Sequence, residues 1–182
     1  MDSREKLNVK GKHMLNNMMF ILATSEVLGL DIEKTINTIK NSKPLEHRME
    51  YVGTFDDIIF YDDSIATIPI ATIDCIETLE NVNTLICGGM DRGVSQKELI
   101  DFLEKSNVKN IICMPETGFI IYEALKDKKN VIKAKTMEEA VKISKDVTEK
   151  NKICLLSPAA SSYNDFKNFE EKGNLFKKLV RE

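Results

Sequence analysis

An alternation of short apolar runs with longer amphipathic segments restricts this chain more than any other feature. The apolar runs are typical of buried strands, and the segments between them repeat apolar residues at the three-to-four spacing of helices. Strands that alternate with helices predict an α/β fold, with a mostly parallel sheet and helices on both faces. We expect strands at residues 51–55, 58–61, 84–87, 110–114, 131–134 and 153–156, the first two as a hairpin, and helices at 68–79, 95–106, 117–125, 136–150 and from 168.

The N-terminal part of the chain predicts helices only. Apolar positions recur at helical spacing between residues 14 and 28, and a glycine that follows is suited to end that helix. Asp31 is suited to cap a second helix, which Pro44 limits because the residue before a proline avoids helical dihedral angles. We therefore expect a short helical segment at 1–43 and an α/β domain at 44–182.

Charge and hydropathy exclude two classes of partner. The chain has 182 residues with 26 Lys and Arg against 29 Asp and Glu, and no segment concentrates the basic residues, so nucleic acid is not an expected partner. No apolar run approaches the ~20 residues that span a bilayer, and no secretory signal begins the chain. We predict no membrane span, and the expected location is the cytoplasm.

Familiar catalytic and metal-binding motifs are missing from the sequence. The four cysteines form no CxxC pair and three lie in apolar runs, which favours buried free thiols over disulfides or metal ligands. Neither His13 nor His47 belongs to a nucleophile–histidine motif, so we predict no catalytic residue and no metal site. No GxxxxGK[ST] phosphate loop occurs, so chemistry on ATP would need another segment.

Small and polar residues gather in the loops after the predicted strands, where open parallel sheets bind ligands. For Asp63 and Ser64 two interpretations stay open, a cap for the next helix or a ligand site. Gly88-Gly89 suits either a tight turn or a ligand that approaches the backbone, and Arg92 offers a guanidinium fork to a carboxylate or phosphate. The loop at 157–162 adds three hydroxyls.

Five stretches carry a resemblance to a known family. They are Gly11-Lys-His13 with Asn17, Pro44-Leu-Glu-His47-Arg48-Met-Glu50, Asp63-Ser64-Ile-Ala66-Thr67, Gly88-Gly-Met-Asp-Arg-Gly93, and Leu156-Ser-Pro-Ala-Ala-Ser-Ser-Tyr-Asn-Asp-Phe-Lys-Asn-Phe169 followed by Glu170-Glu-Lys-Gly173. In this order they resemble the C-terminal part of the Mur peptide ligases, and most of all the branch that adds D-glutamate. The resemblance spans nearly the whole chain, and its last stretch is the most specific.

The resemblance implies a division into domains. Residues 1–43 look like the helical tail of the family's central ATPase domain, and residues 44–182 look like its C-terminal glutamate-ligase domain, which is Rossmann-like. The family's UDP-binding domain lies outside this sequence, as does the part of the ATPase domain with the phosphate loop and the magnesium ligands. The segment alone is therefore expected to be inactive.

The resemblance also implies an activity, namely a ligase that uses ATP and Mg to join UDP-N-acetylmuramoyl-L-alanine to glutamate, expected to be the D enantiomer. An acyl phosphate forms on the muramoyl-L-alanine carboxylate, the amino group of glutamate attacks it, and ADP and phosphate leave. This step belongs to peptidoglycan biosynthesis, on which cell shape and division depend. The present segment would bind the incoming amino acid and close over ATP, with the remaining domains of the same ligase as its partners.

Individual positions match the family's ligand contacts. Asn17 would contact adenine, and Asp63 would contact ribose. Arg48, with His47 beside it, would reach ATP from the domain interface. A cation in the amino-acid site suits a dicarboxylic substrate. The expected contacts of the incoming amino acid are Thr67, Arg92, Ser162, the Tyr163 backbone and Phe169.

Two positions depart from the family pattern. Ile65 stands where the D-glutamate branch usually carries lysine, and Met14 follows His13 where the family usually carries asparagine. The lost cation leaves the handedness and identity of the amino acid open. Two other interpretations are a non-catalytic α/β ligand-binding module derived from the ligase fold, and a ligase similar to folylpolyglutamate synthase, which the last stretch resembles less well.

Overall fold

The computed structural model describes residues 12–42 and 45–182 of the chain, which forms two compact units, Met1–Leu45 and Glu46–Glu182. Whether the first unit is the tail of an ATPase domain stays a prediction. In the part of the chain that the structure describes, no helix is both long and apolar enough to cross a membrane.

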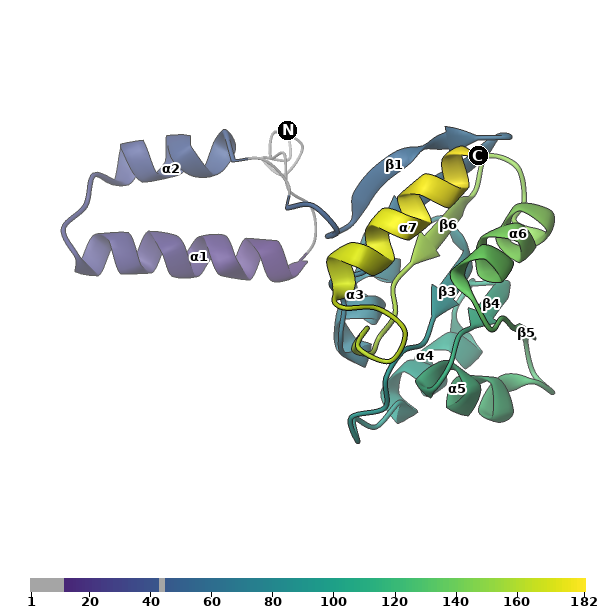
Figure 1. Cartoon of the computed structure of the whole chain (residues 1–182). Coiled ribbons are helices and arrows are strands. Elements are labelled where there is room, and N and C mark those ends of the chain that lie inside the picture. The colour runs from purple at the N-terminus through teal and green to yellow at the C-terminus, as the bar shows by residue number, and fades with distance from the viewer. Residues whose placement is uncertain (1–11, 43–44) are drawn as a thin grey trace. The chain divides into compact units, whose positions relative to one another are not determined.

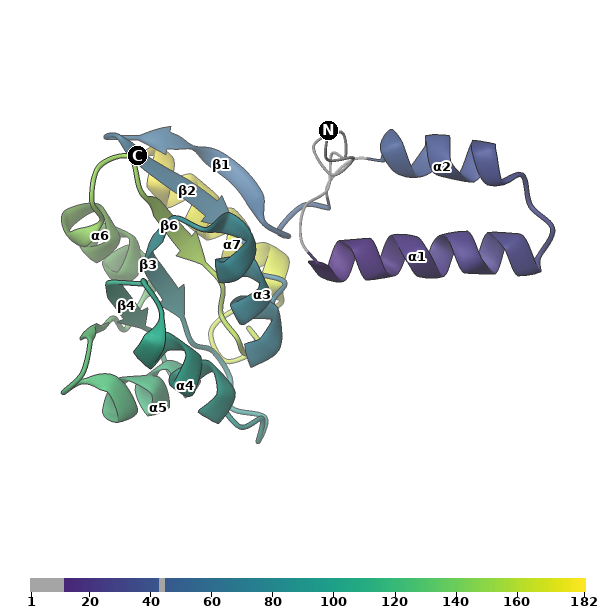
Figure 2. The same cartoon turned by 180° about the vertical axis from the view of Figure 1, so that it is seen from behind.

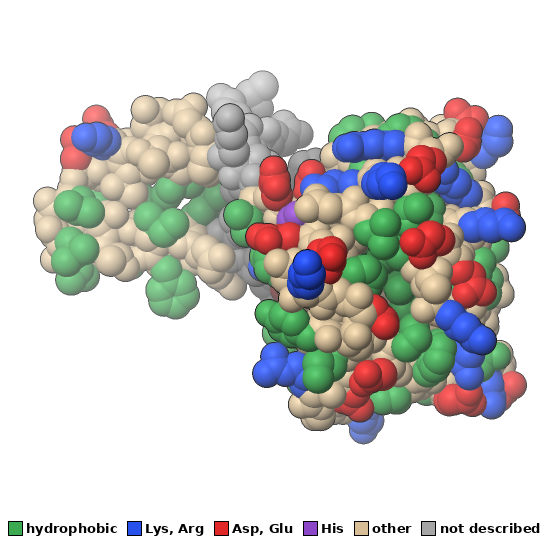
Figure 3. All heavy atoms as spheres, in the orientation of Figure 1, with side chains coloured by type: hydrophobic (Ala, Val, Ile, Leu, Met, Phe, Trp, Pro, Cys, Tyr) green, Lys and Arg blue, Asp and Glu red, His purple; other side chains and the backbone are tan. Residues whose placement is uncertain are grey.

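Two helices form the described part of the first unit. They are α1 (Lys12–Val27) and α2 (Ile32–Lys40), which pack against each other (Figure 1). Asp31 begins α2 as predicted, because its side chain accepts a hydrogen bond from the Lys34 amide at 3.0 Å. Large apolar side chains stay on the surface of this unit (Figure 3), and the side chain of Phe20 is 73% exposed. Much of the apolar surface of this helix pair is thus uncovered.

A six-stranded sheet organises the second unit. Its strands are β1 (Glu50–Phe55), β2 (Ile58–Asp62), β3 (Val82–Cys87), β4 (Asn110–Cys113), β5 (Asn130–Lys133) and β6 (Ile153–Leu156). Their order in space is β1-β2-β6-β3-β4-β5, so β6 lies in the middle and pairs with β2 and β3. Only β1 runs antiparallel to its neighbour. The predicted mostly parallel sheet is confirmed.

Helices cover both faces of this sheet, as predicted (Figure 1, Figure 2). They are α3 (Pro69–Leu79), α4 (Lys97–Lys105), α5 (Thr117–Leu125), α6 (Met137–Val147) and α7 (Phe169–Arg181). Helices α3, α4 and α5 pack on the face that receives Leu85, whereas α6 and α7 pack on the face that receives Ile86. Successive strand side chains point to opposite faces, so a sheet covered on both sides needs the continuous apolar runs seen in the sequence.

The four cysteines lie within the two apolar cores. Three belong to the core under α3 to α5, and Cys154 belongs to the core under α6 and α7. All four are free and buried, as predicted. Burial raises the pKa of the Cys154 thiol to about 12.

One local interpretation was wrong, because neither Asp63 nor Ser64 caps α3. That helix begins at Pro69, and the preceding residue Ile68 provides no side-chain cap. A proline at the first turn has no N–H, so one of the donors that a cap would serve is missing. Asp63 instead accepts a hydrogen bond from the Ser157 hydroxyl across the fold.

Candidate functional site

A cavity of about 390 Å³ opens at the carboxyl edge of the sheet, between the loops that follow β2, β3 and β6 and the start of α5. Three of the five residues predicted to contact an amino acid line it, namely Thr67, Arg92 and Tyr163. Ser162 and Phe169 lie outside its wall. The structure therefore brings together hydroxyl, guanidinium and aromatic groups from three separate loops.

Two glycines after β3 allow the loops around this cavity to approach one another. Gly88 has φ +115°, and a Cβ atom there would collide with the Met114 carbonyl group. A Cβ atom on Gly89 would collide with the Ser161 carbonyl oxygen. At both glycines the closely approaching atoms belong to the protein's own backbone, which favours the tight-turn interpretation of the glycine pair. Beyond this turn Arg92 is exposed on the cavity wall.

Lys172 was missed by the sequence analysis. Its side chain is 1% exposed, and its Nζ donates a hydrogen bond to the Gly88 carbonyl oxygen at 2.7 Å. The ammonium also lies 5.7 Å from the centre of the Phe166 ring. Burial lowers the pKa of Lys172 to about 8. The side chain thus joins the start of α7 to the glycine turn that precedes Arg92.

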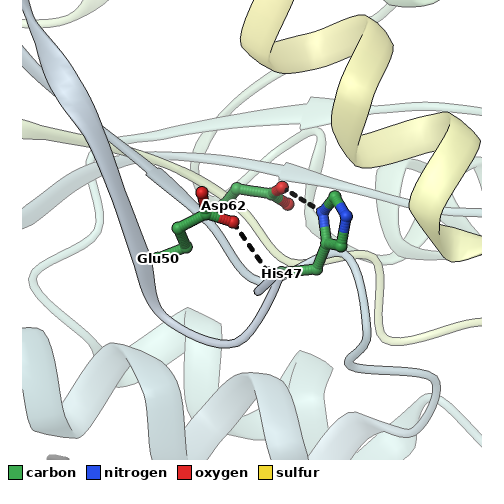
Figure 4. Close-up of side chains that lie close together, drawn as sticks. All are labelled: His47, Glu50 and Asp62. Carbon is green, nitrogen blue, oxygen red and sulfur yellow. Dashed lines mark hydrogen bonds and ion pairs between the residues drawn. The ribbon is translucent and has the colours of Figure 1, made fainter. Parts of the chain in front are cut away.

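His47 and Arg48 lie on a turn before β1 whose backbone is strained. His47 has φ +61° and Met49 has φ +45°, a left-handed conformation that costs non-glycine residues on the order of 1–3 kcal/mol each. His47 is 3% exposed, and its Nδ1 lies 2.7 Å from Asp62 Oδ2 (Figure 4). Its ring meets that of Phe169 edge-on, with centroids 5.8 Å apart. One residue of the expected nucleotide set therefore touches one of the expected amino-acid set.

Asp63 is buried beside this turn with both carboxylate oxygens engaged. Oδ1 accepts the Met49 amide at 3.2 Å, and Oδ2 accepts the Ser157 hydroxyl at 2.9 Å. The Ser157 hydroxyl in turn lies 2.8 Å from Thr72 Oγ1. Burial raises the pKa of Asp63 to about 6, although the hydrogen bond from Ser157 acts in the opposite direction. Asp63 organises the turn here, and its ribose contact stays a prediction.

Glu50, at the start of β1, binds the same turn. Its Oε2 accepts the His47 amide at 2.8 Å and lies 3.0 Å from Lys177 Nζ. Burial alone would raise the pKa of Glu50, but the hydrogen bonds from His47 and Lys177 outweigh it and lower the pKa. Among the described residues, His47, Glu50 and Asp62 form a cluster with the spacing of metal ligands, and here they bind one another and Lys177. The expected lack of a metal site stays a prediction.

The remaining predicted residues are more scattered. Ser162 is buried, and its hydroxyl has no hydrogen-bond partner among residues 12–42 and 45–182. Phe169 begins α7. Asn17 belongs to the first unit, where it lines a groove of about 630 Å³ between α1 and α2, and its adenine contact stays a prediction. A hollow of about 660 Å³ between α3 and α4 contains none of the predicted residues.

Comparison with known proteins gives one consistent group of relatives. No family model matches the chain. The UDP-N-acetylmuramoylalanine–D-glutamate ligase of Citrifermentans bemidjiense is 37% identical over 177 residues, which cover 97% of this chain and 39% of the relative. The ligase of the same name from Clostridioides difficile is 35% identical over 180 residues, which cover 98% and 40%. The chain thus spans about two fifths of the length of these relatives.

Solved structures share the fold at lower sequence identity. UDP-N-acetylmuramate-alanine ligase MurC from Thermotoga maritima matches with a TM-score of 0.70 at 17% identity, over 96% of this chain and 39% of that one. MurF from Acinetobacter baumannii matches with a TM-score of 0.71 at 14% identity, over 97% and 39%. Folylpolyglutamate synthase from Mycobacterium tuberculosis matches with a TM-score of 0.66 at 14% identity, over 93% and 41%. These matches establish the fold.

Proposed function

We propose that this chain belongs to the Mur ligase family as a homologue of part of its D-glutamate-adding members, and that it binds the incoming glutamate and closes over ATP in such a ligase. The ligase would join UDP-N-acetylmuramoyl-L-alanine to D-glutamate in peptidoglycan biosynthesis. The observation that carries the proposal is the 34–37% identity to ligases of one name over 97–98% of this chain.

The cavity at the carboxyl edge of the sheet is the proposed amino-acid site. The guanidinium of Arg92 would bind one carboxylate of glutamate through two parallel hydrogen bonds. The hydroxyl groups of Thr67 and Ser162 and the Tyr163 backbone would hold the second carboxylate, with Phe169 beside it. The three residues that line one cavity support this assignment. Positioning the amine against the activated carboxylate is the contribution expected of these residues.

The turn before β1 is the proposed nucleotide contact of this unit. Arg48 would neutralise phosphate charge on ATP, with His47 beside it and Asp63 reaching the ribose. ATP would supply the phosphoryl group that activates the muramoyl-L-alanine carboxylate. No residue of this chain is assigned to Mg. The magnesium ligands and the phosphate loop of the ligase would lie in the three fifths of the relatives that the chain does not match.

The first unit, with Asn17 as the proposed adenine contact, would be the end of the central ATPase domain. Its exposed apolar side chains support this assignment, since residues such as Phe20 would then pack against the rest of that domain. The 182 residues alone are accordingly proposed to hydrolyse no ATP. The expected cellular location is the cytoplasm, where the nucleotide substrate is used.

A chimera tests the proposed function. The upstream three fifths of the Clostridioides difficile ligase would be joined to this chain, and ADP release would be measured with UDP-N-acetylmuramoyl-L-alanine and either enantiomer of glutamate. We expect turnover with D-glutamate, and Arg92→Ala should raise the KM for glutamate far more than that for ATP. Arg181→Ala, an exposed site at the end of α7, is the matched control. A chimera that binds glutamate but never releases ADP would instead favour a non-catalytic binding module.

A further inference from the structure

The turn that carries Arg48 is held by acidic side chains, and one of these has no role assigned so far. We propose that Asp62 is a positioning residue, which fixes His47 and thereby the direction in which Arg48 leaves the turn. The consequence for nucleotide use rests on the proposed function. The positioning role itself does not depend on the proposed function, because every contact that supports it lies within the second unit.

Backbone strain on both sides of Arg48 is the first observation. His47 at φ +61° and Met49 at φ +45° both adopt the left-handed conformation that favours glycine. Two such residues around one arginine persist only where the surrounding structure over-determines them. Strain of this kind clusters at active sites, ligand clamps and switch regions.

Three carboxylates supply that surrounding structure. Glu50 accepts the His47 amide at 2.8 Å, and Asp63 accepts the Met49 amide at 3.2 Å. Asp62 lies 2.7 Å from Nδ1 of the His47 ring (Figure 4). The carbonyl oxygen of His47 also accepts the Ile65 amide at 3.3 Å. Hydrogen bonds thus hold both strained residues by their amide groups, and they hold His47 also by its ring and its carbonyl oxygen.

Asp62 differs from the other two carboxylates because it holds a side chain. It is fully buried, and its second oxygen accepts the Ser64 amide at 2.9 Å, so its own orientation is fixed. A carboxylate can only accept, so the proton of a neutral His47 ring lies on Nδ1, and Nε2 carries no proton. The missing side chain of Gly173 lets α7 pack directly against this pair. Phe169 from the same helix meets the ring edge. These contacts restrict the ring, and Asp62 holds it through the hydrogen bond to Nδ1.

Two substitutions separate positioning from bulk stability. Asp62→Ala removes the acceptor for both Nδ1 and the Ser64 amide. Asp62→Asn keeps both contacts: its amide oxygen accepts from Ser64, and its NH₂ group donates to Nδ1, which moves the ring proton to Nε2. Asn110→Ala is the matched control. Asn110 is a buried side chain with hydrogen bonds to Asn83 and to the Val147 carbonyl, at the opposite end of the strands.

The first measurement uses the 182-residue chain and long-range ¹H–¹⁵N NMR of the His47 ring. We expect the proton of the neutral ring on Nδ1 in the wild-type protein, on Nε2 in Asp62→Asn, and on a mixture of both in Asp62→Ala. The Arg48 Nε–H resonance should shift in Asp62→Ala and stay in place in Asn110→Ala. A wild-type ring protonated on Nε2, or an Arg48 resonance unaffected by Asp62→Ala, would overturn the proposal.

The second measurement uses the active chimera. Asp62→Ala should raise the KM for ATP by about tenfold and leave the KM for glutamate within about twofold, whereas Asp62→Asn should restore the KM for ATP to within about threefold of wild type. Asn110→Ala should lower stability without separating the two constants. Equal changes in the KM for ATP and the KM for glutamate would contradict the positioning role of Asp62. A wild-type chimera without turnover would contradict the proposed function, while the NMR measurement would still decide the role of Asp62.

Discussion

Replacing Lys172 by methionine should remove a pH dependence that the buried ammonium imposes on folding. Burial lowers the pKa of Lys172 from 10.5 to about 8. At a pH between these two values, Lys172 keeps its proton in the unfolded chain but has released it in the folded chain. The free energy of unfolding of the wild-type protein therefore rises with pH across this interval, and the gain is lost as the pH falls through 8.

The size of the effect follows from the same two values. An interval of about 2.5 pH units corresponds to about 3 kcal/mol, of which about 2 kcal/mol falls between pH 7 and pH 9.5. Methionine has a similar length and no titrating group, so Lys172→Met should lack this rise. At pH 7 the variant avoids the cost of a buried charge, but it leaves the Gly88 carbonyl without its donor, and these two effects oppose each other.

Urea unfolding from pH 7 to 9.5 measures this difference directly. Circular dichroism is the suitable probe because the chain has no tryptophan, and a reductant keeps the four cysteines free. We expect the stability difference between wild type and Lys172→Met to move by about 2 kcal/mol in favour of the wild type. Lys142→Met, at an exposed lysine on α6, controls for the loss of one positive charge. A stability difference that stays constant over this range would refute the burial of the ammonium.

Because burial raises the pKa of Asp63 from 3.8 to about 6, the contribution of Asp63 to stability should fall by about 3 kcal/mol as pH rises from 3.8 through 6. In urea unfolding, the stability difference between wild type and Asp63→Asn should therefore move by about this amount in favour of the variant, and a constant difference would contradict the raised pKa. Gly173→Ala should lower the free energy of unfolding by about 1–3 kcal/mol, since its Cβ atom would collide with His47, Ser64 and Asp62. Asn174→Ala, on the exposed side of α7, should leave the free energy of unfolding unchanged. Equal values for the two variants would contradict the close packing at Gly173. The four cysteines should react with an aromatic disulfide reagent only as fast as the protein unfolds, and rapid labelling of the native protein would disprove their burial.

The sequence predicted the strands well because of how they are buried. Every residue of β3, β4 and β6 is buried, so these strands stand out as continuous apolar runs. The helices begin close to their predicted starts where a side-chain cap defines the boundary, as Thr136 does for α6 and Asn168 for α7. The order of the strands has no such local signal. That β6 pairs with β2 and β3 depends on contacts between segments distant in the sequence.

The candidate site was only partly predictable for the same reason. The loops that contain Thr67 and Arg92 could be singled out because they follow strand ends at the same edge of the sheet, whereas the roles expected of these two residues came from the resemblance to the ligase family. The helix-cap interpretation of Asp63 was wrong, since its partners Met49 and Ser157 come from other segments. Lys172 gave no sign of its burial, because a lysine in an amphipathic helix predicts an exposed position. Its acceptor, the Gly88 carbonyl, lies 84 residues away along the chain.

The central position of β6 has a consequence for how this protein is made. During synthesis the ribosome delivers this strand after the other five. Until it arrives, the β1–β2 hairpin and the β3–β4–β5 group each present an unpaired strand edge, which is a template for association between nascent chains. A chain that ends before Ile153 would therefore keep five of the six described strands and still aggregate, because the missing strand connects the two halves of the sheet.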